Sequence, residues 1–165
     1  PDSTEWITGN EALRRWGTTD CAFFALTKES TIICYLIIAF NDIYIPSLGL
    51  RQYIDDETAY TALVYTRTGY RGKGFAANLN LWVQQYLKRH GYGRYITLIE
   101  PKNTASQKTH KKAGMINYQS VVYRRFLFLK YYRVNDEATK RFKRYWSIRT
   151  ADRDMWKAFS KIIKK

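Results

Sequence analysis

The stretch from Tyr60 to Gly91, YTALVYTRTGYRGKGFAANLNLWVQQYLKRHG, decides the fold of this 165-residue chain. Its first seven residues are typical of a β-strand, because β-branched and aromatic residues favour an extended backbone. After Gly74, apolar residues recur at the spacing of one buried helix face: Phe75, Leu79, Trp82, Val83, Tyr86 and Leu87. His90 and Gly91 then supply a cation and a glycine stop at the helix end. The stretch therefore predicts a strand, a tight turn and an amphipathic helix.

The turn between the predicted strand and helix, RTGYRGKGFAA, is suited to binding an anion. Gly72 and Gly74 let the backbone turn tightly and come close to a ligand. The amides of Gly72 to Ala76 would then lie unpaired at a helix N-terminus, where the helix dipole favours negative charge. Arg71 and Lys73 add positive charge, so a pyrophosphate is the expected guest. The spacing matches neither G-x-x-x-x-G-K-[ST] nor G-x-G-x-x-G, which excludes those two phosphate loops.

The residues before this stretch predict a helix and a β-hairpin. Asn10 to Gly17 are expected to form a short helix, capped by the Asn and stopped by the Gly. Two β-rich runs follow, Ala22 to Leu26 and Thr31 to Phe40, separated by a short polar turn. Asn41 to Thr58 contain a proline, a glycine and three successive acids, and we interpret them as strand pieces and loop.

The residues after the stretch predict that strands and helices continue to alternate. Tyr95 to Glu100 are expected to form a strand, Thr104 to Ala113 a helix stopped by Gly114, and Ile116 to Tyr132 one or more strands. The element order indicates an α/β (α+β) fold with a mixed, mostly antiparallel sheet flanked by helices. We expect one domain, with its core in residues 1–134. Because the chain begins at Pro1 rather than at a Met, residues are expected to precede it in the full protein.

Residues 135–165 are expected to be a basic helical extension of the same domain. Asn135 can cap one helix with Phe142, Tyr145 and Trp146 on one face, and Thr150 can cap another. Residues 124–165 hold 14 of the 28 Lys and Arg and four acids, whereas the whole chain has a net charge of +14. Such a tail predicts either a solvated helical face or contact with a polyanion, namely nucleic acid, an anionic membrane surface or a phosphorylated ligand.

The two cysteines and the hydropathy pattern bear on the compartment. Cys21 and Cys34 both lie in strand-like apolar runs, which predicts buried thiols and fits a reducing cytoplasm. No apolar stretch reaches about 18 residues, so no transmembrane segment is predicted.

Two motifs resemble those of the GNAT (N-acetyltransferase) superfamily. The spacing Arg71-x-x-Gly74-x-Ala76 is similar to the acyl-CoA pyrophosphate signature (Gln/Arg)-x-x-Gly-x-(Gly/Ala). One helix and one strand later, the residues from Asn103 to Met115 resemble the pattern Asn-x-x-(Ala/Ser)-x-x-Leu-Tyr-x-Lys-x-Gly-Phe. The departures from that pattern are Thr109 for Leu, His110 for Tyr and Met115 for Phe. The resemblance covers about residues 21–132 and is strong over 66–115.

The resemblance implies an acyltransferase that uses acetyl-CoA or another acyl-CoA as co-substrate and needs no metal. It implies a sheet splayed between its fourth and fifth strands, with the pantetheine arm paired to the backbone near residues 65–67. The cofactor-binding residues expected from it are Tyr65, Thr66, Arg67, Arg71, Gly72, Lys73, Gly74, Phe75, Ala76, Asn103 and Ser106. From the sequence alone, Asn103 is equally suited to be a plain N-cap.

The catalytic groups are less clearly marked. In the family, a Tyr at the position of His110 often protonates the leaving thiolate, and an imidazole has a pKa suited to that task. The alternative is that His110 is a surface residue of a basic helix. Glu57 and Glu100 are the candidates for a general base, although the acidic run Asp55-Asp56-Glu57 is also typical of a solvated turn.

The expected acceptor is an amine on a small molecule or a peptide, bound around residues 41–57, where three acids would attract a cation. One alternative keeps the fold but takes the acyl group from acyl carrier protein or aminoacyl-tRNA. Another is a non-catalytic module that binds nucleic acid or a membrane surface. The apolar stripes of the tail are expected to dock on the sheet or on a second subunit, which would make the protein a homodimer.

Overall fold

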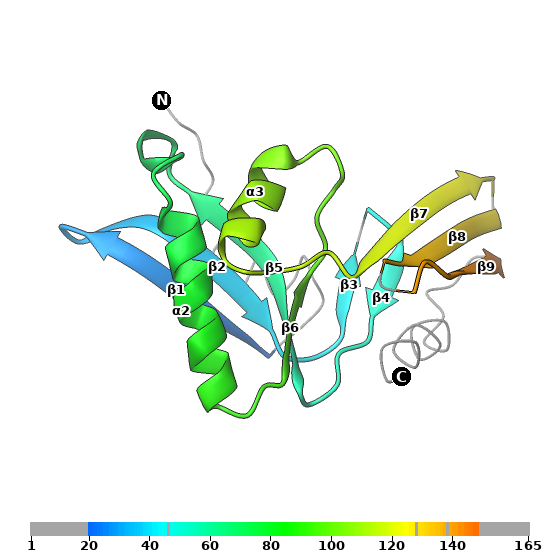
Figure 1. The fold of residues 1–165 in the computed structure, drawn as a ribbon, viewed down its shortest axis with the longest axis horizontal. Coiled ribbons are helices and arrows are strands. Elements are labelled where there is room, and N and C mark those ends of the chain that lie inside the picture. The colour runs from blue at the N-terminus through cyan, green and yellow to red at the C-terminus, as the bar shows by residue number, and fades with distance from the viewer. Residues whose placement is uncertain (1–19, 46, 128, 138, 149–165) are drawn as a thin grey trace. The chain divides into compact units, whose positions relative to one another are not determined.

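The computed structural model describes residues 20–45, 47–127, 129–137 and 139–148. The chain divides into two compact units (Figure 1). The first unit comprises Pro1–Ile43 and Ile54–Met115, and the second comprises Tyr44–Tyr53 and Ile116–Lys165. The helices predicted over residues 10–17 and after Thr150 lie outside the described residues.

The first unit is built on a four-stranded mixed sheet. It contains β1 (Cys21–Lys28), β2 (Thr31–Ala39), β5 (Thr58–Thr66) and β6 (Arg94–Thr97), in the order β1-β2-β5-β6. The β1–β2 and β2–β5 pairs are antiparallel, whereas β6 runs parallel to β5. This arrangement confirms the predicted hairpin and the predicted mixed, mostly antiparallel sheet.

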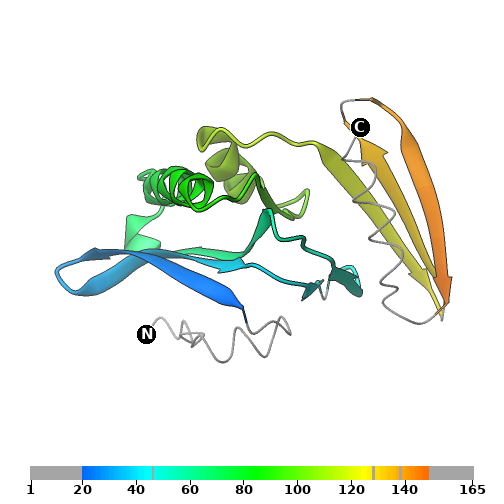
Figure 2. The same cartoon turned by 90° about the horizontal axis from the view of Figure 1, so that it is seen from below.

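Two helices cover one face of this sheet (Figure 2). They are α2 (Phe75–Arg89), as the apolar periodicity predicts, and α3 (Thr104–Lys112), a helix that was expected over residues 104–113. Leu79, Val83 and Leu87 of α2 are buried in a cluster with side chains of β2 and β5. These three residues lie four positions apart on one helix face, so burying them fixes the rotation of α2 over the sheet. None of the described helices is long and apolar enough to span a membrane.

The regular elements of the second unit are all strands in its described part. Its strands are β3 (Ile43–Ile45, whose first residue belongs to the first unit), β4 (Leu50–Gln52), β7 (Gln119–Phe126), β8 (Leu129–Asp136) and β9 (Phe142–Ile148). β3 pairs with β4, and β7-β8-β9 form an antiparallel sheet. Tyr132 is fully buried, and its hydroxyl donates to the Leu48 carbonyl at 2.9 Å.

The predicted helix capped by Asn135 is wrong. Asn135 lies inside β8, and residues 142–148 form the strand β9, which pairs with β8 along its length. Phe142, Arg144 and Trp146 therefore share one sheet face instead of a helix face. Residue 134, after which the extension was expected to begin, lies within β8.

Candidate functional site

The sheet of the first unit is open along the second half of β5. β5 pairs with β2 as far as Thr66, but its pairing with β6 ends at Thr61, opposite Thr97. In the described part of the chain, no strand continues the sheet beside residues 62–66 on that side. Backbone groups on this open edge can therefore pair with an extended ligand, as in β-strand addition.

A glycine-rich loop connects the open edge of β5 to the start of α2. Gly72 and Gly74 have φ values of +76° and +85°, a left-handed conformation that favours glycine. The first helical bond runs from the Asn78 amide to the Gly74 carbonyl at 3.0 Å. The amides of residues 75–77 precede that bond and have no intrahelical acceptor. Because the first turn of α2 contains no acidic residue, this positive helix end is available to an anion.

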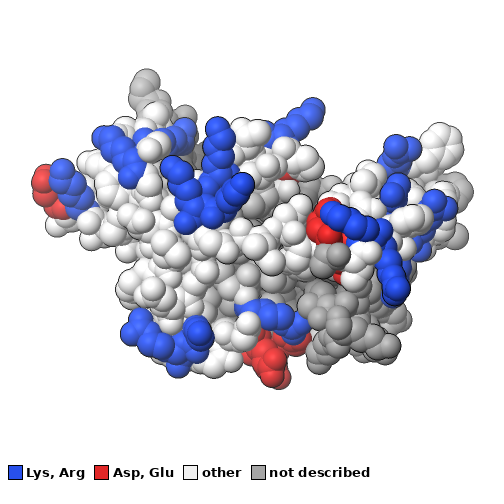
Figure 3. Space-filling view, viewed as in Figure 1, with Lys and Arg blue, Asp and Glu red and all other residues white. Residues whose placement is uncertain are grey.

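Side chains fix the loop to the end of β5. The Arg71 Nε donates to the Thr66 carbonyl at 2.9 Å, and the Arg67 amide donates to the Ile33 carbonyl at 2.9 Å. The Lys73 ammonium lies 5.5 Å from the ring centroid of Tyr70, a cation–π contact. Arg71 and Lys73 are nevertheless exposed, and basic side chains gather around the loop and on α3 (Figure 3). A phosphate would meet backbone amides and two cations.

Helix α3 holds the second group of predicted site residues. Asn103 caps the helix, since its Oδ1 accepts from the Ser106 amide at 3.0 Å. His110 is only 4% exposed, and its Nδ1 lies 2.8 Å from the Ser106 carbonyl and 3.3 Å from the Ser106 hydroxyl. A carbonyl can only accept, so Nδ1 carries a proton in this arrangement.

The other ring nitrogen of His110, Nε2, differs from Nδ1 in its surroundings. Nε2 is buried and has no hydrogen-bond partner among the described residues. A buried polar atom without a partner costs about 1–3 kcal/mol, so its retention calls for a ligand or a function. His110 is therefore not the surface residue that the sequence allowed as an alternative.

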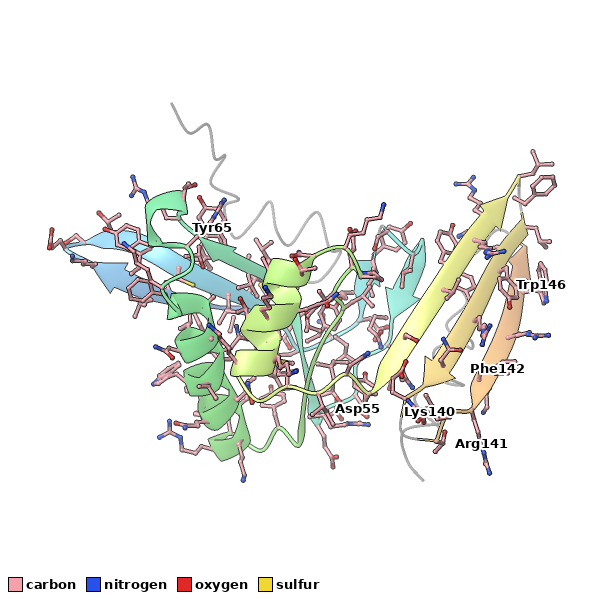
Figure 4. The ribbon with its side chains drawn as sticks, turned by 45° about the horizontal axis from the view of Figure 1, so that its top comes forward. Asp55, Tyr65, Lys140, Arg141, Phe142 and Trp146 are labelled. Carbon is pink, nitrogen blue, oxygen red and sulfur yellow. The ribbon has the colours of Figure 1, made fainter. Side chains whose placement is uncertain are left out.

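The predicted acids lie in three different settings. Asp55 forms a salt bridge with Arg94 and accepts from the Thr58 hydroxyl, which ties the start of β5 to the start of β6. Asp56 and Glu57 are exposed next to it. Asp55 and Tyr65 lie at opposite ends of β5 (Figure 4). Because a strand rises about 3.3 Å per residue, the backbone of Glu57 is about 30 Å from that of Thr66. Glu100 is exposed in the turn before α3, where its carbonyl accepts from the Asn103 amide at 2.9 Å.

A buried polar network that sequence reasoning missed joins α2 to β6. Asn80 is fully buried; its Nδ2 donates to the Ala76 carbonyl at 2.8 Å, and its Oδ1 accepts from the Tyr95 hydroxyl at 2.9 Å. Burial raises the pKa of Tyr95 to about 12. The network ties the first turn of α2 to β6. Its one sequence signal is a polar Asn next to Leu79 on the apolar helix face.

The cysteines offer no activated nucleophile. Both Cys21 and Cys34 are free, and Cys34 is buried with its Sγ 3.3 Å from the Thr66 hydroxyl. Burial raises the pKa of both thiols, the opposite of what a nucleophilic cysteine requires. The predicted buried thiols are thus confirmed for Cys34, while Cys21 is partly buried.

The open edge of β5, followed by the glycine-rich loop and the N-terminus of α2, has a geometry suited to an extended ligand with a phosphate group. A family model described as "Acetyltransferase (GNAT) family" matches residues 2–115, more than half of the chain. The chain belongs to this acetyltransferase family. None of the curated proteins matches the sequence significantly.

Several solved structures share the fold. One is the aminoglycoside acetyltransferase AAC(6')-Iy with a bisubstrate analogue, at 21% identity and a TM-score of 0.54, with 76% of this chain and 80% of that chain covered. A second is BH1408 from Bacillus halodurans, at 14% identity and a TM-score of 0.55, with 77% and 78% covered. A third is an aminoglycoside acetyltransferase from an uncultured soil sample, at 10% identity and a TM-score of 0.53, with 76% and 78% covered. These likenesses show the fold alone; the family model identifies the protein as an acetyl-CoA-dependent N-acetyltransferase of the GNAT family.

Proposed function

We propose that this enzyme moves an acetyl group directly from acetyl-CoA to the amine of a small cationic acceptor. The observation that carries the proposal is that the open edge of β5 and the N-terminus of α2 lie one after the other along the chain. A single ligand with an amide-rich arm and a pyrophosphate would pair with both. Acetyl-CoA has both parts.

The amides of residues 72–76 would bind the pyrophosphate, with Arg71 and Lys73 adding charge. The pantetheine arm would pair with the backbone of residues 65–67 and continue along the open edge of β5 toward the middle of the strand. Thr66 and Arg71 serve this arrangement indirectly, because their mutual bond holds the loop at the strand end. Asn103 and Ser106 would position α3, and with it His110.

The chemistry needs one net proton transfer. The amine nitrogen attacks the thioester carbonyl, the carbon–sulfur bond breaks, and the proton lost by nitrogen must reach the departing sulfur. A backbone amide on the open edge would polarise the carbonyl. We assign delivery of the proton to Nε2 of His110, because that atom has no other partner and its ring is held through Nδ1. Since Nδ1 carries the proton of the neutral ring, Nε2 would first receive the proton that leaves the amine, by way of the general base or water, and would then pass it to the sulfur.

Acceptance of the amine proton is assigned to Glu100 or Glu57, directly or through water. Glu100 is favoured on position, since it follows β6 and precedes the helix that carries His110. Glu57 lies at the start of β5, together with Asp56. These acids would attract a cationic acceptor in a chain with a net charge of +14. The fold neighbours include aminoglycoside acetyltransferases, one of them solved with sisomicin, which favours an acceptor of that kind over a peptide.

The experiment is a coupled measurement of free thiol and acetylated product. The enzyme is incubated with acetyl-CoA and a panel of aminoglycosides, polyamines and N-terminal peptides, with thiol release followed by a chromogenic disulfide and products by mass spectrometry. We expect equal amounts of thiol and of one acetylated small amine. Acetylated peptides alone would contradict the acceptor class, and thiol release without any acetylated amine would contradict transfer.

A further inference from the structure

The β7-β8-β9 sheet has one face that the acetyl-transfer site does not use. Strand alternation and register place its side chains in rows across the three strands. One row is Arg124, Tyr131 and Trp146, and the next is Val122, Arg133 and Arg144. The third row is Ser120, Asn135 and Phe142. We call these nine residues the arginine–aromatic face.

This face is the exposed side of the sheet. Trp146 is 64% exposed and Phe142 is 47% exposed, whereas Tyr132 and Val134, which alternate with the face residues along β8, are buried. Figure 4 shows Phe142 and Trp146 projecting from β9, with Lys140 and Arg141 in the turn that precedes it. Large aromatic side chains on a solvent-facing sheet are unusual unless they meet a partner.

One aromatic ring of the face, that of Phe142, is paired with two cations. The guanidinium carbons of Arg133 and Arg144 lie 4.6 Å and 5.0 Å from the ring centroid of Phe142. Trp146 and Tyr131 have ring centroids 4.8 Å apart. The Arg133 Nε also donates to Asn135 Oδ1 at 2.9 Å, which holds the guanidinium in place. The face therefore offers rings and positive charges in a fixed pattern.

The charge on this face has one sign. Its ionisable groups are three arginines and a tyrosine, and no carboxylate belongs to the rows among the described residues. The carboxylate at its edge, Glu137, accepts from the Ser120 hydroxyl at 2.9 Å and pairs with Lys140 at 3.4 Å. An anionic partner that also presents flat π-surfaces would be complementary to both features.

We propose that the arginine–aromatic face binds single-stranded nucleic acid, with bases stacked on Phe142 and Trp146 and phosphates on the arginines. Phe142 and Trp146 lie four residues apart on β9, about 13 Å along the strand. Arg144 lies between them on the same face, where the sugar–phosphate backbone that connects the two stacked nucleotides would pass. The arginines would also attract an acidic globular protein or an anionic lipid surface. Two separate exposed rings, however, are suited to stacking with bases rather than to those partners.

The test uses the full chain and a fluorescein-labelled oligouridine, with fluorescence anisotropy read from about 50 to 200 mM salt. Each phosphate contact contributes about −0.7 to the slope of log affinity against log salt, so three arginines predict a slope of about −2. Arg133→Gln with Arg144→Gln should reduce it to about −0.7. The matched control, Lys88→Gln with Arg89→Gln, removes two exposed cations at the end of α2 and should leave the slope unchanged.

The aromatic variants separate stacking from charge. Phe142→Leu with Trp146→Leu keeps the net charge, and it should weaken oligouridine binding at least tenfold while acetyl-CoA binding stays the same. Trp82→Ala removes a 49% exposed aromatic of the first unit and should have no effect on oligouridine binding. Folding of each variant is checked by circular dichroism and by acetyl-CoA titration. None of these measurements requires turnover, so the test is independent of the proposed acetyl transfer.

Three results would overturn the proposal. One is the absence of oligouridine binding at the lowest salt. Another is unchanged binding by the Leu double variant, which would reduce the contact to charge alone. The third is assignment of the face to another partner. Loss of self-association in that variant, measured by analytical ultracentrifugation, would assign it to a second copy, and preferential binding of phosphatidylserine-containing vesicles would assign it to a membrane.

Discussion

Gly74 allows the anion-binding role of the loop to be separated from its folding role. Its φ of +85° lies in the left-handed region, and a Cβ added there would meet no atom within 4 Å. Gly74→Ala therefore costs only backbone strain, about 1–2 kcal/mol of folding free energy. Gly74→Asp carries the same strain, but a carboxylate at a helix N-terminus is favourable to the helix by about 0.3–1 kcal/mol. Gly74→Asp should thus be at least as stable as Gly74→Ala.

The affinity for acetyl-CoA should be lower in Gly74→Asp than in Gly74→Ala, although the stability should not be. A carboxylate about 4 Å from a phosphate charge is repelled by about 1 kcal/mol in water and about 4 kcal/mol near a protein surface. We therefore expect Gly74→Asp to bind acetyl-CoA at least tenfold more weakly than Gly74→Ala, which corresponds to about 1.4 kcal/mol. Titration calorimetry and thermal unfolding of the two variants give both quantities. Equal affinity in the two variants would refute binding of the pyrophosphate at this helix end.

Three further predictions concern the catalytic and structural side chains. His110→Ala should lower kcat more than it changes the KM for acetyl-CoA, with partial recovery in His110→Tyr; unchanged turnover in both, with chemistry rate-limiting, would exclude a proton-transfer role. Because burial raises the pKa of Tyr95 from 10.0 to about 12, the unfolded state loses this proton first, and stability should fall as pH rises from about 10 to about 12. Tyr95→Phe should flatten that slope in urea unfolding, and an equal slope would contradict it. Neutralising Asp56 and Glu57 should raise the acceptor KM at constant acetyl-CoA affinity, and equal acceptor kinetics would place the acceptor elsewhere.

The sequence predicts the strand–loop–helix part of the site well because every signal there is local. Helix periodicity, two glycines at positive φ and the cations Arg71 and Lys73 lie within one short segment. The roles of Asp55 and Asn80 could not be predicted in the same way. Asp55 pairs with Arg94, 39 residues away, and Asn80 accepts from Tyr95, 15 residues away. Such contacts depend on which strands become neighbours.

The wrong helix after Asn135 has a local physical cause. The Asp136 Oδ1 accepts from the Thr139 amide at 2.8 Å, the same contact over three residues that an N-cap makes. Here the contact lies in the connection between β8 and β9, where Lys140 has a φ of +55°. The spacing of Phe142 and Trp146 fits one face of a helix as well as one face of a strand. Pairing with β8 favours the strand.

The sequence also does not predict the position of the turn between β7 and β8. It contains no glycine or proline, and Leu127 adopts the positive φ of +52° instead. Leu127 is 71% exposed, so its side chain gains little from burial that would offset this strain. The continuous β-pattern of residues 116–132 therefore gave no sign of where the chain reverses.

Hydrogen exchange of the backbone amides with and without acetyl-CoA tests the central claim most directly, because it locates the co-substrate on the chain. Resolved by residue in NMR spectra, it should show protection at two places: the open edge of β5 between residues 62 and 66, and the loop amides of residues 72–77. The amides by which β2 and β5 already pair should change little, since the two strands protect one another in both states. Protection confined to other segments, with residues 62–66 and 72–77 unaffected at saturating acetyl-CoA, would contradict the account.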